Sequence, residues 1–415
     1  MIERKTIKIE KRFSLACFMA VFADALAVST CLWADDGITD DTKPKVTKPA
    51  PIEKAKPADE AKPADKKKPV KVKPPKSPVK APKNLTECDE AYMKGSYSNA
   101  AAGYKTLLGD KSTSVQASIG LARALDATGK YAKALKNLES QAKLGVESVA
   151  WNVALAEALE KVGRYEEATV AIQRAVKKDP LWPMAILVQG RLLETVGKKA
   201  EALEVYGRMS DVMAQDSLWK DAPTLVILGK IFDRTEILKG KKSSDQATNI
   251  LHNYLQESYQ KDNEKYWPGN VAAGDFLLSK HRASGAAVEY GLALKSNKNC
   301  VEAIVGQAAI QLEQWQFENC MGAVNRALKI NPNHHDALLV KASCYMLWRK
   351  FSMAPPIIQK VLNTNPNHIE ALSLMAAAHM RMFNDKLAGP YVDRVDKINS
   401  NSHQLPTIIA EWLAA

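Results

Sequence analysis

Apolar side chains in the body of the chain fall into pairs of stretches with helical spacing. The stretch 149–182 shows the pattern clearly, with apolar residues at Leu155, Ala156 and Leu159, then at Ala168, Ile172, Ala175 and Val176. Steps of three and four residues place each set on one face of a helix. Gly163 lies between the two sets and allows a tight reversal because it has no Cβ. The pattern predicts a hairpin of two helices.

The hairpin pattern recurs at a fixed interval of thirty-four positions, which we call the repeat period. A Gly-x-Tyr-x-x-Ala motif or its variant begins at Gly95, Gly129, Gly163 and Gly197. The turn Asn-Pro-Asn-His occurs at 331–334 and again, one repeat period later, at 365–368. A fixed period of this length is typical of a repeat architecture in which each unit is one helix pair.

These motifs resemble the tetratricopeptide repeat family, which has Gly-x-Tyr at the turn, Ala positions in the second helix and Pro at the end of each unit. Two departures are visible: the turn glycine is missing from the C-terminal units, and Phe317 and Phe351 stand where Tyr97 stands in the first unit. The resemblance implies units at about 81–114, 115–148, 149–182, 183–216, a longer and divergent 217–266, then 267–300, 301–334, 335–368 and 369–402.

The fold that this resemblance implies is all-α, an α-solenoid of helix hairpins in a right-handed superhelix. First helices would line the concave side and second helices the convex side. Small residues at Ala122, Ala156 and Gly190 would let the helices approach closely. Residues 235–246 lengthen one turn, and we expect a kink or protruding loop there that divides the array into two halves.

The N-terminus has the parts of a secretory signal peptide. Five basic residues lie in 1–12, and an apolar run follows from Phe13 to Trp33. Cleavage after Ala34 or at Ala25-x-Ala27 fits the pattern. An uncleaved membrane anchor is the alternative, although Asp24 in the middle of the run would cost about 2.5–3.5 kcal/mol on insertion. The stretch ending at Cys31 resembles a bacterial lipobox, with Thr30 as a departure, so a lipoprotein at Cys31 is a further alternative.

A basic linker follows the signal. Residues 43–83 contain fourteen Lys, four carboxylates and ten of the twenty prolines, and they lack Tyr, Phe, Trp, Leu and Met. Such a composition cannot bury enough apolar surface to fold and favours an extended chain. We expect a spacer that holds the body away from a surface. The alternative is a segment that binds an anionic polymer of the cell envelope.

Composition narrows the functional class. The net charge of +12 comes from the linker, because residues 84–415 carry only about +4, so no nucleic acid is expected as a partner. Six cysteines exclude a disulfide-dense scaffold. The prediction is therefore a signal peptide at 1–34, a disordered linker at 35–83, an N-terminal array at 84–216, a divergent unit at 217–266, a C-terminal array at 267–402 and a capping helix at 403–415.

Candidate catalytic chemistry is scarce in this sequence. His334, His335 and His368 lie in the repeated turns and are interpreted as repeat positions rather than metal ligands. Cys320 and Cys344 are interpreted as small core residues, with a disulfide between their adjacent units as the alternative. No phosphate-binding glycine loop and no Gly-x-Ser-x-Gly motif is present. We predict no enzyme activity, no metal and no cofactor.

The concave face is the predicted binding surface. In this family, positions five, nine and twelve of the first helices face the groove. The N-terminal half would present a mixed-charge trough and the C-terminal half an apolar trough suited to a peptide or a helix. The candidate residues are Arg123, Glu157, Arg191, Glu194 and Lys230 in the first trough, and Val305, Leu312, Leu339, Met346 and Met380 in the second.

The function that follows is a non-enzymatic scaffold of the bacterial cell envelope, exported to the periplasm, the envelope or the medium, that binds a protein or peptide in the concave groove. The alternative is an envelope adhesion protein, in which residues 43–83 bind an anionic polymer and the repeats self-associate.

Overall fold

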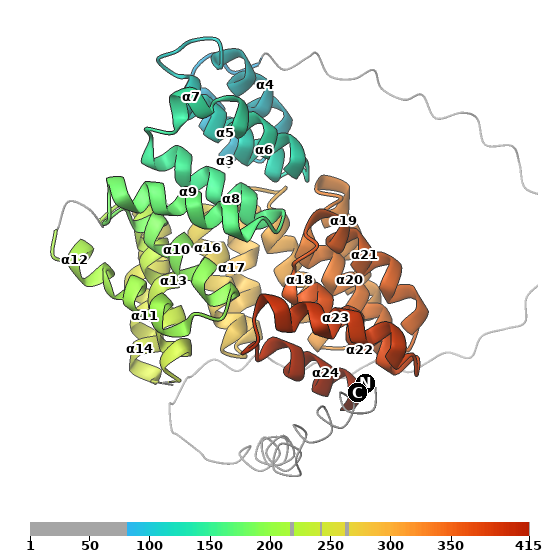
Figure 1. Ribbon diagram of the computed structural model, residues 1–415. Coiled ribbons are helices and arrows are strands. Elements are labelled where there is room, and N and C mark those ends of the chain that lie inside the picture. The colour runs from blue at the N-terminus through green and yellow to red at the C-terminus, as the bar shows by residue number, and fades with distance from the viewer. Residues whose placement is uncertain (1–80, 216–219, 241–242, 262–264, 415) are drawn as a thin grey trace, which may run out of the picture. The chain divides into compact units, whose positions relative to one another are not determined.

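The computed structural model describes residues 81–215, 220–240, 243–261 and 265–414, all within one compact unit that spans residues 75–415 (Figure 1). The described residues form helices and turns and contain no strand, which confirms the predicted all-α fold. No helix among them is both long and apolar enough to cross a membrane. The predicted signal peptide and nearly all of the predicted linker lie outside the described residues.

The helices form nine hairpins and a final helix within the described ranges. Hairpins 1–4 are α3 (Leu85–Met93) with α4 (Tyr97–Leu107), α5 (Ser114–Asp126) with α6 (Tyr131–Ser140), α8 (Val149–Lys161) with α9 (Tyr165–Lys178), and α10 (Pro183–Thr195) with α11 (Lys199–Gly207). The short helices α7 (Ala142–Gly145) and α12 (Met209–Met213) follow α6 and α11.

Hairpin 5 pairs α13 (Ala222–Lys239) with a segment made of α14 (Ser244–Asn249), the π-helix η2 (Ile250–Gln256) and α15 (Glu257–Gln260). Hairpins 6–9 are α16 (Trp267–Ser279) with α17 (Ala283–Ser296), α18 (Val301–Glu313) with α19 (Phe317–Ile330), α20 (His335–Leu347) with η3 (Phe351–Met353) and α21 (Ala354–Thr364), and α22 (Ile369–Arg381) with α23 (Asp385–Ile398). The last helix is α24 (Gln404–Ala414).

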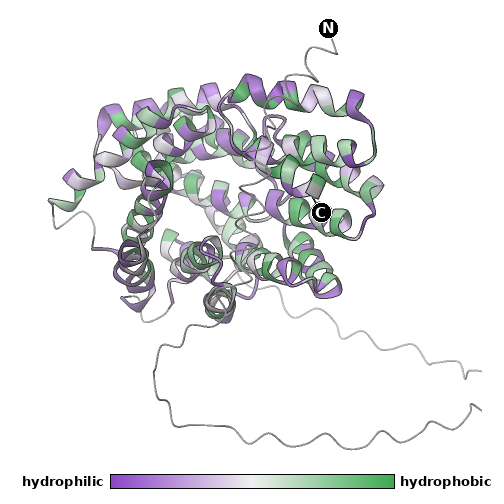
Figure 2. Ribbon diagram, turned by 90° about the horizontal axis from the view of Figure 1, so that it is seen from below, coloured by the Kyte–Doolittle hydropathy of each residue, from purple (hydrophilic) through white to green (hydrophobic). Residues whose placement is uncertain are grey.

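Each hairpin leaves an apolar face that its neighbours cover. The helices carry hydrophobic and hydrophilic residues side by side in Figure 2, as amphipathic helices do. Trp151, Ile172, Leu228 and Tyr290 are among the largest fully buried side chains and come from three different hairpins. The hydrophobic core therefore extends along the array, as expected when repeats stack on one another.

The structure shows that part of the expected loop at 235–246 is helical. Residues 235–239 continue helix α13, which runs for 18 residues from Ala222 to Lys239. Gly240 ends the helix in the left-handed region at φ 67°, and α14 begins at Ser244. The extra residues therefore lengthen the first helix of hairpin 5, because the sequence 235–239 has no helix-breaking residue before Gly240.

The array returns on itself, so that turns far apart in the sequence touch. The turn inside hairpin 2 meets the Asn-Pro-Asn turn between hairpins 7 and 8. There Asn331 Nδ2 donates to the Tyr131 hydroxyl at 3.2 Å and to the Asp126 carbonyl at 3.1 Å. Asn333 Nδ2 donates to the Gly129 carbonyl at 2.9 Å. We call this set of bonds an inter-coil contact.

The inter-coil contact is repeated in the hairpins on either side. Hairpin 1 uses Tyr97 and Gly95 with Asn297 and Asn299, and hairpin 3 uses Tyr165 and Gly163 with Asn365 and Asn367. In hairpin 4 the tyrosine position is Lys199, and a bond runs from Asn399 Nδ2 to the Glu194 carbonyl at 3.3 Å. The repeated Gly-x-Tyr and Asn-x-Asn motifs are thus the two halves of one contact.

The turn glycines are required at these contacts for two reasons. Gly95, Gly129, Gly163 and Gly197 all have φ between 73° and 81°, a region that side chains with Cβ rarely adopt. A Cβ at any of them would also lie 2.2–2.4 Å from the Oδ1 of the asparagine in the facing turn. Glycine therefore allows both the reversal of the chain and the close approach of the next turn.

Candidate functional site

A cavity of about 1760 Å³ lies inside the array. Its wall comes from the first helices of hairpins 1–5, together with the starts of α20 and α22 from hairpins 8 and 9. The inter-coil contacts bring these two groups of hairpins together, because they attach the turns between hairpins 6–9 to hairpins 1–3. The cavity therefore exists because the late hairpins come back to contact the early ones.

Four of the predicted groove residues, Arg123, Glu157, Arg191 and Glu194, line this cavity. Lys230 is exposed on α13, the first helix of hairpin 5. The protein around Lys230 lowers its pKa by desolvation, and the charge of Asp275 acts in the opposite direction. The predicted mixed-charge half of the groove thus corresponds to polar side chains on first helices.

Three arginines of this wall are engaged with neighbouring side chains, two of them in ion pairs. Arg191 Nη2 lies 2.6 Å from Glu160 Oε2, and Arg191 Nε lies 2.9 Å from Glu160 Oε1, which makes a two-pronged pair. Arg234 lies 3.0 Å from Glu194, whose other oxygen accepts a bond from the Tyr206 hydroxyl. The Arg123 guanidinium stacks over the Tyr92 ring at 4.8 Å. These arginines are therefore already engaged with groups of the wall.

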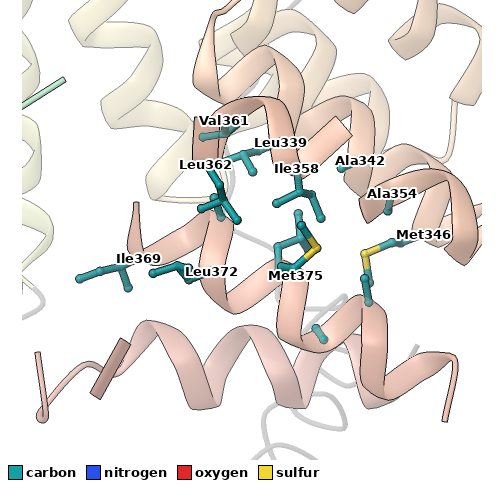
Figure 3. Packing of buried hydrophobic residues seen from close by; sticks show 14 of the residues in the cluster. Leu339, Ala342, Met346, Ala354, Ile358, Val361, Leu362, Ile369, Leu372 and Met375 are labelled. Carbon is teal, nitrogen blue, oxygen red and sulfur yellow. The ribbon is translucent and has the colours of Figure 1, made fainter. Parts of the chain in front are cut away.

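The structure corrects the predicted apolar trough of the C-terminal half. Val305, Leu339 and Met346 are 7%, 2% and 1% exposed, and Figure 3 shows Leu339 and Met346 among the packed side chains of the C-terminal core. Leu312 and Met380 are half-buried and pack against neighbouring core residues. None of the five lines the cavity. These positions pack between adjacent hairpins, so they form core instead of an open groove.

Three carboxylates that the sequence did not single out lie at one repeat position of the C-terminal hairpins, and we call them the acidic row. Glu302, Asp336 and Glu370 follow one another at one repeat period, at the second position of α18, α20 and α22, and all three are exposed. Asp336 and Glu370 line the cavity. The protein that encloses the cavity raises the pKa of Glu370 to about 7, and the charge of Asp336 adds to this shift. An acidic residue recurring at one repeat position was the signal that could have identified this row.

Lys161 is the cation placed among these acids. Burial alone would lower its pKa, but Asp126, Asp336 and Glu302 outweigh that effect and raise the pKa above its ordinary value. Its ammonium group lies 5.6 Å from the centre of the Tyr131 ring. Lys161 thus lies between the acidic row and Tyr131, which belongs to the inter-coil contact of hairpin 2.

The histidines of the repeated turns are structural. The Nδ1 atoms of His334 and His368 accept bonds from the backbone N–H groups of Ala337 and Ala371 and so cap α20 and α22. His335 is 5% exposed and packs edge-on against Tyr131 and His368 at 5.3 and 5.2 Å. Burial, followed by the charge of His368, lowers the pKa of His335 to about 3, so its ring is neutral.

Other reactive side chains in the described ranges are buried or dispersed. These ranges contain no group of three or more His, Cys, Asp or Glu side chains that could hold a metal ion. Cys88, Cys300, Cys320 and Cys344 are free thiols and are buried. Burial raises the pKa of Cys320 to about 12, which makes it a poor nucleophile. Cys320 and Cys344 are thus core residues, and in this structure they do not form the disulfide considered as the alternative.

Comparison with known proteins agrees with the repeat pattern. Residues 153–209, from α8 to α12, match the family model for the tetratricopeptide repeat. The matched segment, residues 153–209, is thus of the tetratricopeptide repeat type. A search of curated protein sequences gives no significant match.

Solved structures that resemble this array of helix hairpins are distant in sequence. A tetratricopeptide repeat protein from Parabacteroides merdae ATCC 43184 is 16% identical, with a TM-score of 0.42 over 64% of this chain and 99% of that chain. A thermophilic tetratricopeptide repeat protein from Thermus thermophilus is 18% identical, with a TM-score of 0.38 over 48% and 100%. Human IFIT1, solved as a dimer with PPP-AAAA, is 15% identical, with a TM-score of 0.41 over 73% and 69%.

Proposed function

We propose that the chain is a non-enzymatic scaffold that binds an extended polypeptide inside the cavity of its repeat array. Tetratricopeptide repeats serve protein–protein interaction in general, and the cavity is the concave surface that this array offers. Its volume of about 1760 Å³ is larger than the roughly 300–1,000 Å³ of ordinary small-molecule pockets. A segment of polypeptide is the ligand that fits such a volume.

The charges of the wall indicate which side chains this polypeptide carries. Seven carboxylates but only five Lys and Arg line the cavity, although residues 84–415 as a whole have an excess of positive charge. Arg191 and Arg234 are already paired with wall carboxylates. Asp336 and Glu370 form no ion pair within the described residues. We therefore infer that the bound segment presents Lys or Arg to Asp336 and Glu370.

The proposal rests on Asp336 and Glu370, the two members of the acidic row that line the cavity. Their role can be tested directly. A short fluorescent peptide rich in Lys and Arg is titrated with the full chain, and binding is followed by anisotropy. At pH 8, where Glu370 is mostly ionised, we expect the double variant Asp336→Asn, Glu370→Gln to bind about tenfold more weakly, because it removes two charges from the wall.

A matched control removes two exposed carboxylates from second helices, with Glu167→Gln on α9 and Glu201→Gln on α11. The control equals the double variant in net charge and should bind as the unchanged chain does. Equal weakening by both variants would show that the peptide responds only to total charge. Unchanged binding by the Asp336, Glu370 variant would place the peptide outside the cavity.

Export is part of this proposal and rests on the residues of the N-terminus alone. A basic region followed by an apolar run is the pattern of a secretory signal, and the envelope or the medium would then be the site of action. Binding of an anionic polymer by residues 43–83 also stays a prediction. Both depend on segments that lie almost wholly outside the described residues.

A further inference from the structure

Within the described ranges, four residues other than glycine have positive φ, and they occupy one position of the repeat. His281, Trp315, Arg349 and Phe383 have φ between 56° and 60° and follow one another at one repeat period. They stand in the turns inside hairpins 6–9, at the position that the turn glycines hold in hairpins 1–4. A left-handed backbone is disfavoured for residues with Cβ, so bulky residues that adopt it point to a role beyond the packing of the chain.

The inter-coil contacts place these turns away from the early hairpins. Each of hairpins 6–9 is attached to an early hairpin through the asparagine turn that follows its second helix. The second helices α17, α19 and α23 have 14 residues each, which corresponds to a length of about 20 Å. The turns inside hairpins 6–9 lie at the opposite ends of these second helices, and their four residues with positive φ are exposed there.

Large apolar side chains protrude from these four turns. We call the four turns the turn edge and define it as residues 278–284, 312–318, 346–353 and 380–387. Trp315 is 65% exposed and Phe383 is 97% exposed, while Met353 and Leu387 are about half exposed. The Phe383 ring therefore stands clear of the chain and gains no stability from burial within this molecule.

Contacts between rings and cations join neighbouring turns of the turn edge. The ring of Phe317 packs against Trp315 in its own turn and against Trp348 in the next, with centres 5.9 and 5.5 Å apart. The Arg381 guanidinium lies 4.9 Å from the centre of the Phe351 ring and joins the turns of hairpins 8 and 9. The turns of hairpins 7–9 therefore form one continuous surface.

The turn edge has an excess of positive charge. It contains six Lys and Arg but three Asp and Glu, and one of the cations, Lys280, is paired with Asp233 on α13 at 2.8 Å. Four of the cations form no ion pair within the described residues, namely Arg282, Arg349, Lys350 and Lys386. A second copy of this edge would bring like charges together, so exposed rings among these cations favour a negatively charged partner.

We propose that the turn edge binds the surface of a lipid bilayer that contains anionic phospholipids. Trp315 and Phe383 enter the headgroup layer, and Arg349 and Lys350 lie at the phosphate groups. Aromatic side chains concentrate at membrane–water interfaces, and anionic lipids attract Lys and Arg to the same surface. A protein partner would need a pocket shaped for the Phe383 ring, whereas a headgroup layer accepts a protruding ring without one.

This surface is separate from the cavity, because no residue of the turn edge lines the cavity wall. The inference therefore does not depend on the proposed function. Binding to a bilayer through the turn edge would hold the array at a membrane without a spanning helix and would leave the cavity wall to its own ligand.

The test is co-sedimentation of the full chain with vesicles of phosphatidylcholine alone, or with about 30% phosphatidylglycerol added. We expect tighter binding to the anionic vesicles, and the double variant Trp315→Gly, Phe383→Gly should weaken it by about tenfold or more. Glycine is the residue that hairpins 1–4 have at this position, so the variant should keep the circular dichroism and melting temperature of the unchanged chain. Arg349→Gln with Lys350→Gln should weaken binding to the anionic vesicles by about tenfold.

A fluorescence measurement separates the turn edge from the basic linker. Residues 1–80 are present in every variant, so their attraction to the vesicles cancels in each comparison. Trp315→Phe keeps an aromatic ring and should bind as the unchanged chain does. Brominated phospholipid should quench its tryptophan fluorescence less than that of the unchanged chain, because the Trp315 ring lies among the lipids and the linker contains no Trp.

Two matched controls alter exposed side chains on second helices, away from the turn edge. Val170→Ser with Val288→Ser removes two apolar side chains from α9 and α17, which are 48% and 63% exposed. Lys133→Gln with Lys136→Gln removes two cations from α6. Both controls should bind the vesicles nearly as the unchanged chain does.

Three results would overturn the proposal. Vesicle binding that Trp315→Gly with Phe383→Gly leaves unchanged would assign membrane attraction to the basic linker or the N-terminus. Absence of binding to the anionic vesicles would favour a protein as the partner of the turn edge. Equal binding to both kinds of vesicle would show that lipid charge has no part in the contact.

Discussion

The side chain of Asn331 donates a hydrogen bond to the hydroxyl of Tyr131 across 200 residues of sequence, at 3.2 Å. The same spacing joins Asn297 to Tyr97 and Asn365 to Tyr165. Each pair links the turn inside an early hairpin to the turn after a late one. These contacts convert a one-dimensional array, whose repeats would touch only their neighbours, into a structure with long-range contacts that enclose a cavity.

The Asn331–Tyr131 bond should be measurable as a coupling energy. Asn331→Ala should cost about 1–3 kcal/mol of unfolding free energy because it leaves the buried Tyr131 hydroxyl and the Asp126 carbonyl without their partner. Combined with Tyr131→Phe, the two losses should be less than additive by about 0.5–1.5 kcal/mol, as chemical denaturation of the four proteins would show. Tyr131→Phe with Asn399→Ala, which belongs to another contact, should be additive. A coupling equal to that of this control would contradict the assignment.

Gly129→Ala should destabilise the chain more than Gly240→Ala does. Both glycines are left-handed, at φ 74° and 67°, so both substitutions carry backbone strain of about 1–2 kcal/mol. Only at Gly129 would the new Cβ lie 2.4 Å from Asn331 Oδ1, whereas nothing lies within 4 Å at Gly240. We expect about 1–3 kcal/mol of additional loss at Gly129 from this overpacking, measured by urea unfolding. Equal losses at the two sites would show that the facing turn can move away.

The fold was largely predictable because its signals are local. Gly163 and its equivalents mark a turn, and the apolar residues on either side mark the two helices, so one repeat period contains the information for a hairpin. The longer hairpin 5 was harder, because helix α13 continues through residues 235–239 although the period predicts a turn there. A stretch of sequence that permits a helix does not show by itself where the helix ends.

The site was less predictable because it depends on contacts between distant hairpins. Asn365 and Gly163 were both recognised as repeat positions, but their contact depends on how many hairpins complete one turn of the array. Leu339 and Met346 occupy positions that face the groove in the family pattern, and here the packing of adjacent hairpins covers them. Glu370 stands at a different repeat position, and its access to the cavity follows from the same packing.

His335 should make the stability of the chain sensitive to acid. Its pKa of about 3 lies below the ordinary value of 6.5, with burial as the main cause, so the unfolded chain binds a proton between these values and the folded chain does not. The contribution of this group is therefore fully present above pH 6.5 and is lost as the pH is lowered. Between about pH 6.5 and pH 4 the loss should be about 3 kcal/mol.

The comparison that isolates His335 is His335→Phe, which keeps a ring beside Tyr131 and His368 but cannot be protonated. Unfolding free energies of the two proteins should converge or reverse in order as the pH falls from 6.5 to 4, with the variant losing less. His403→Gln, at an exposed position, serves as the control and should follow the unchanged chain. Parallel curves for His335→Phe and the unchanged chain would show that other groups cause the acid sensitivity.

Glu370 should make the binding of cationic peptides depend on pH near neutrality. Its pKa of about 7 is raised by the surrounding protein and then by Asp336, so the side chain is mostly neutral at pH 6 and mostly ionised at pH 8. A carboxylate attracts Lys and Arg only when it is ionised. The affinity for a Lys- and Arg-rich peptide should therefore rise by about threefold to tenfold over this interval, as anisotropy titrations would show.

The Glu370 carboxyl can be separated from other titrating groups in two ways. In Glu370→Gln the rise in affinity between pH 6 and pH 8 should be lost, while Glu167→Gln should keep it. Because a bound cation favours the ionised form, the peptide should also lower the pKa of Glu370. Peptide binding at pH 7 should then release protons, which calorimetry in buffers of different ionisation enthalpy detects. Affinity that is flat between pH 6 and pH 8 would remove Glu370 from the binding surface.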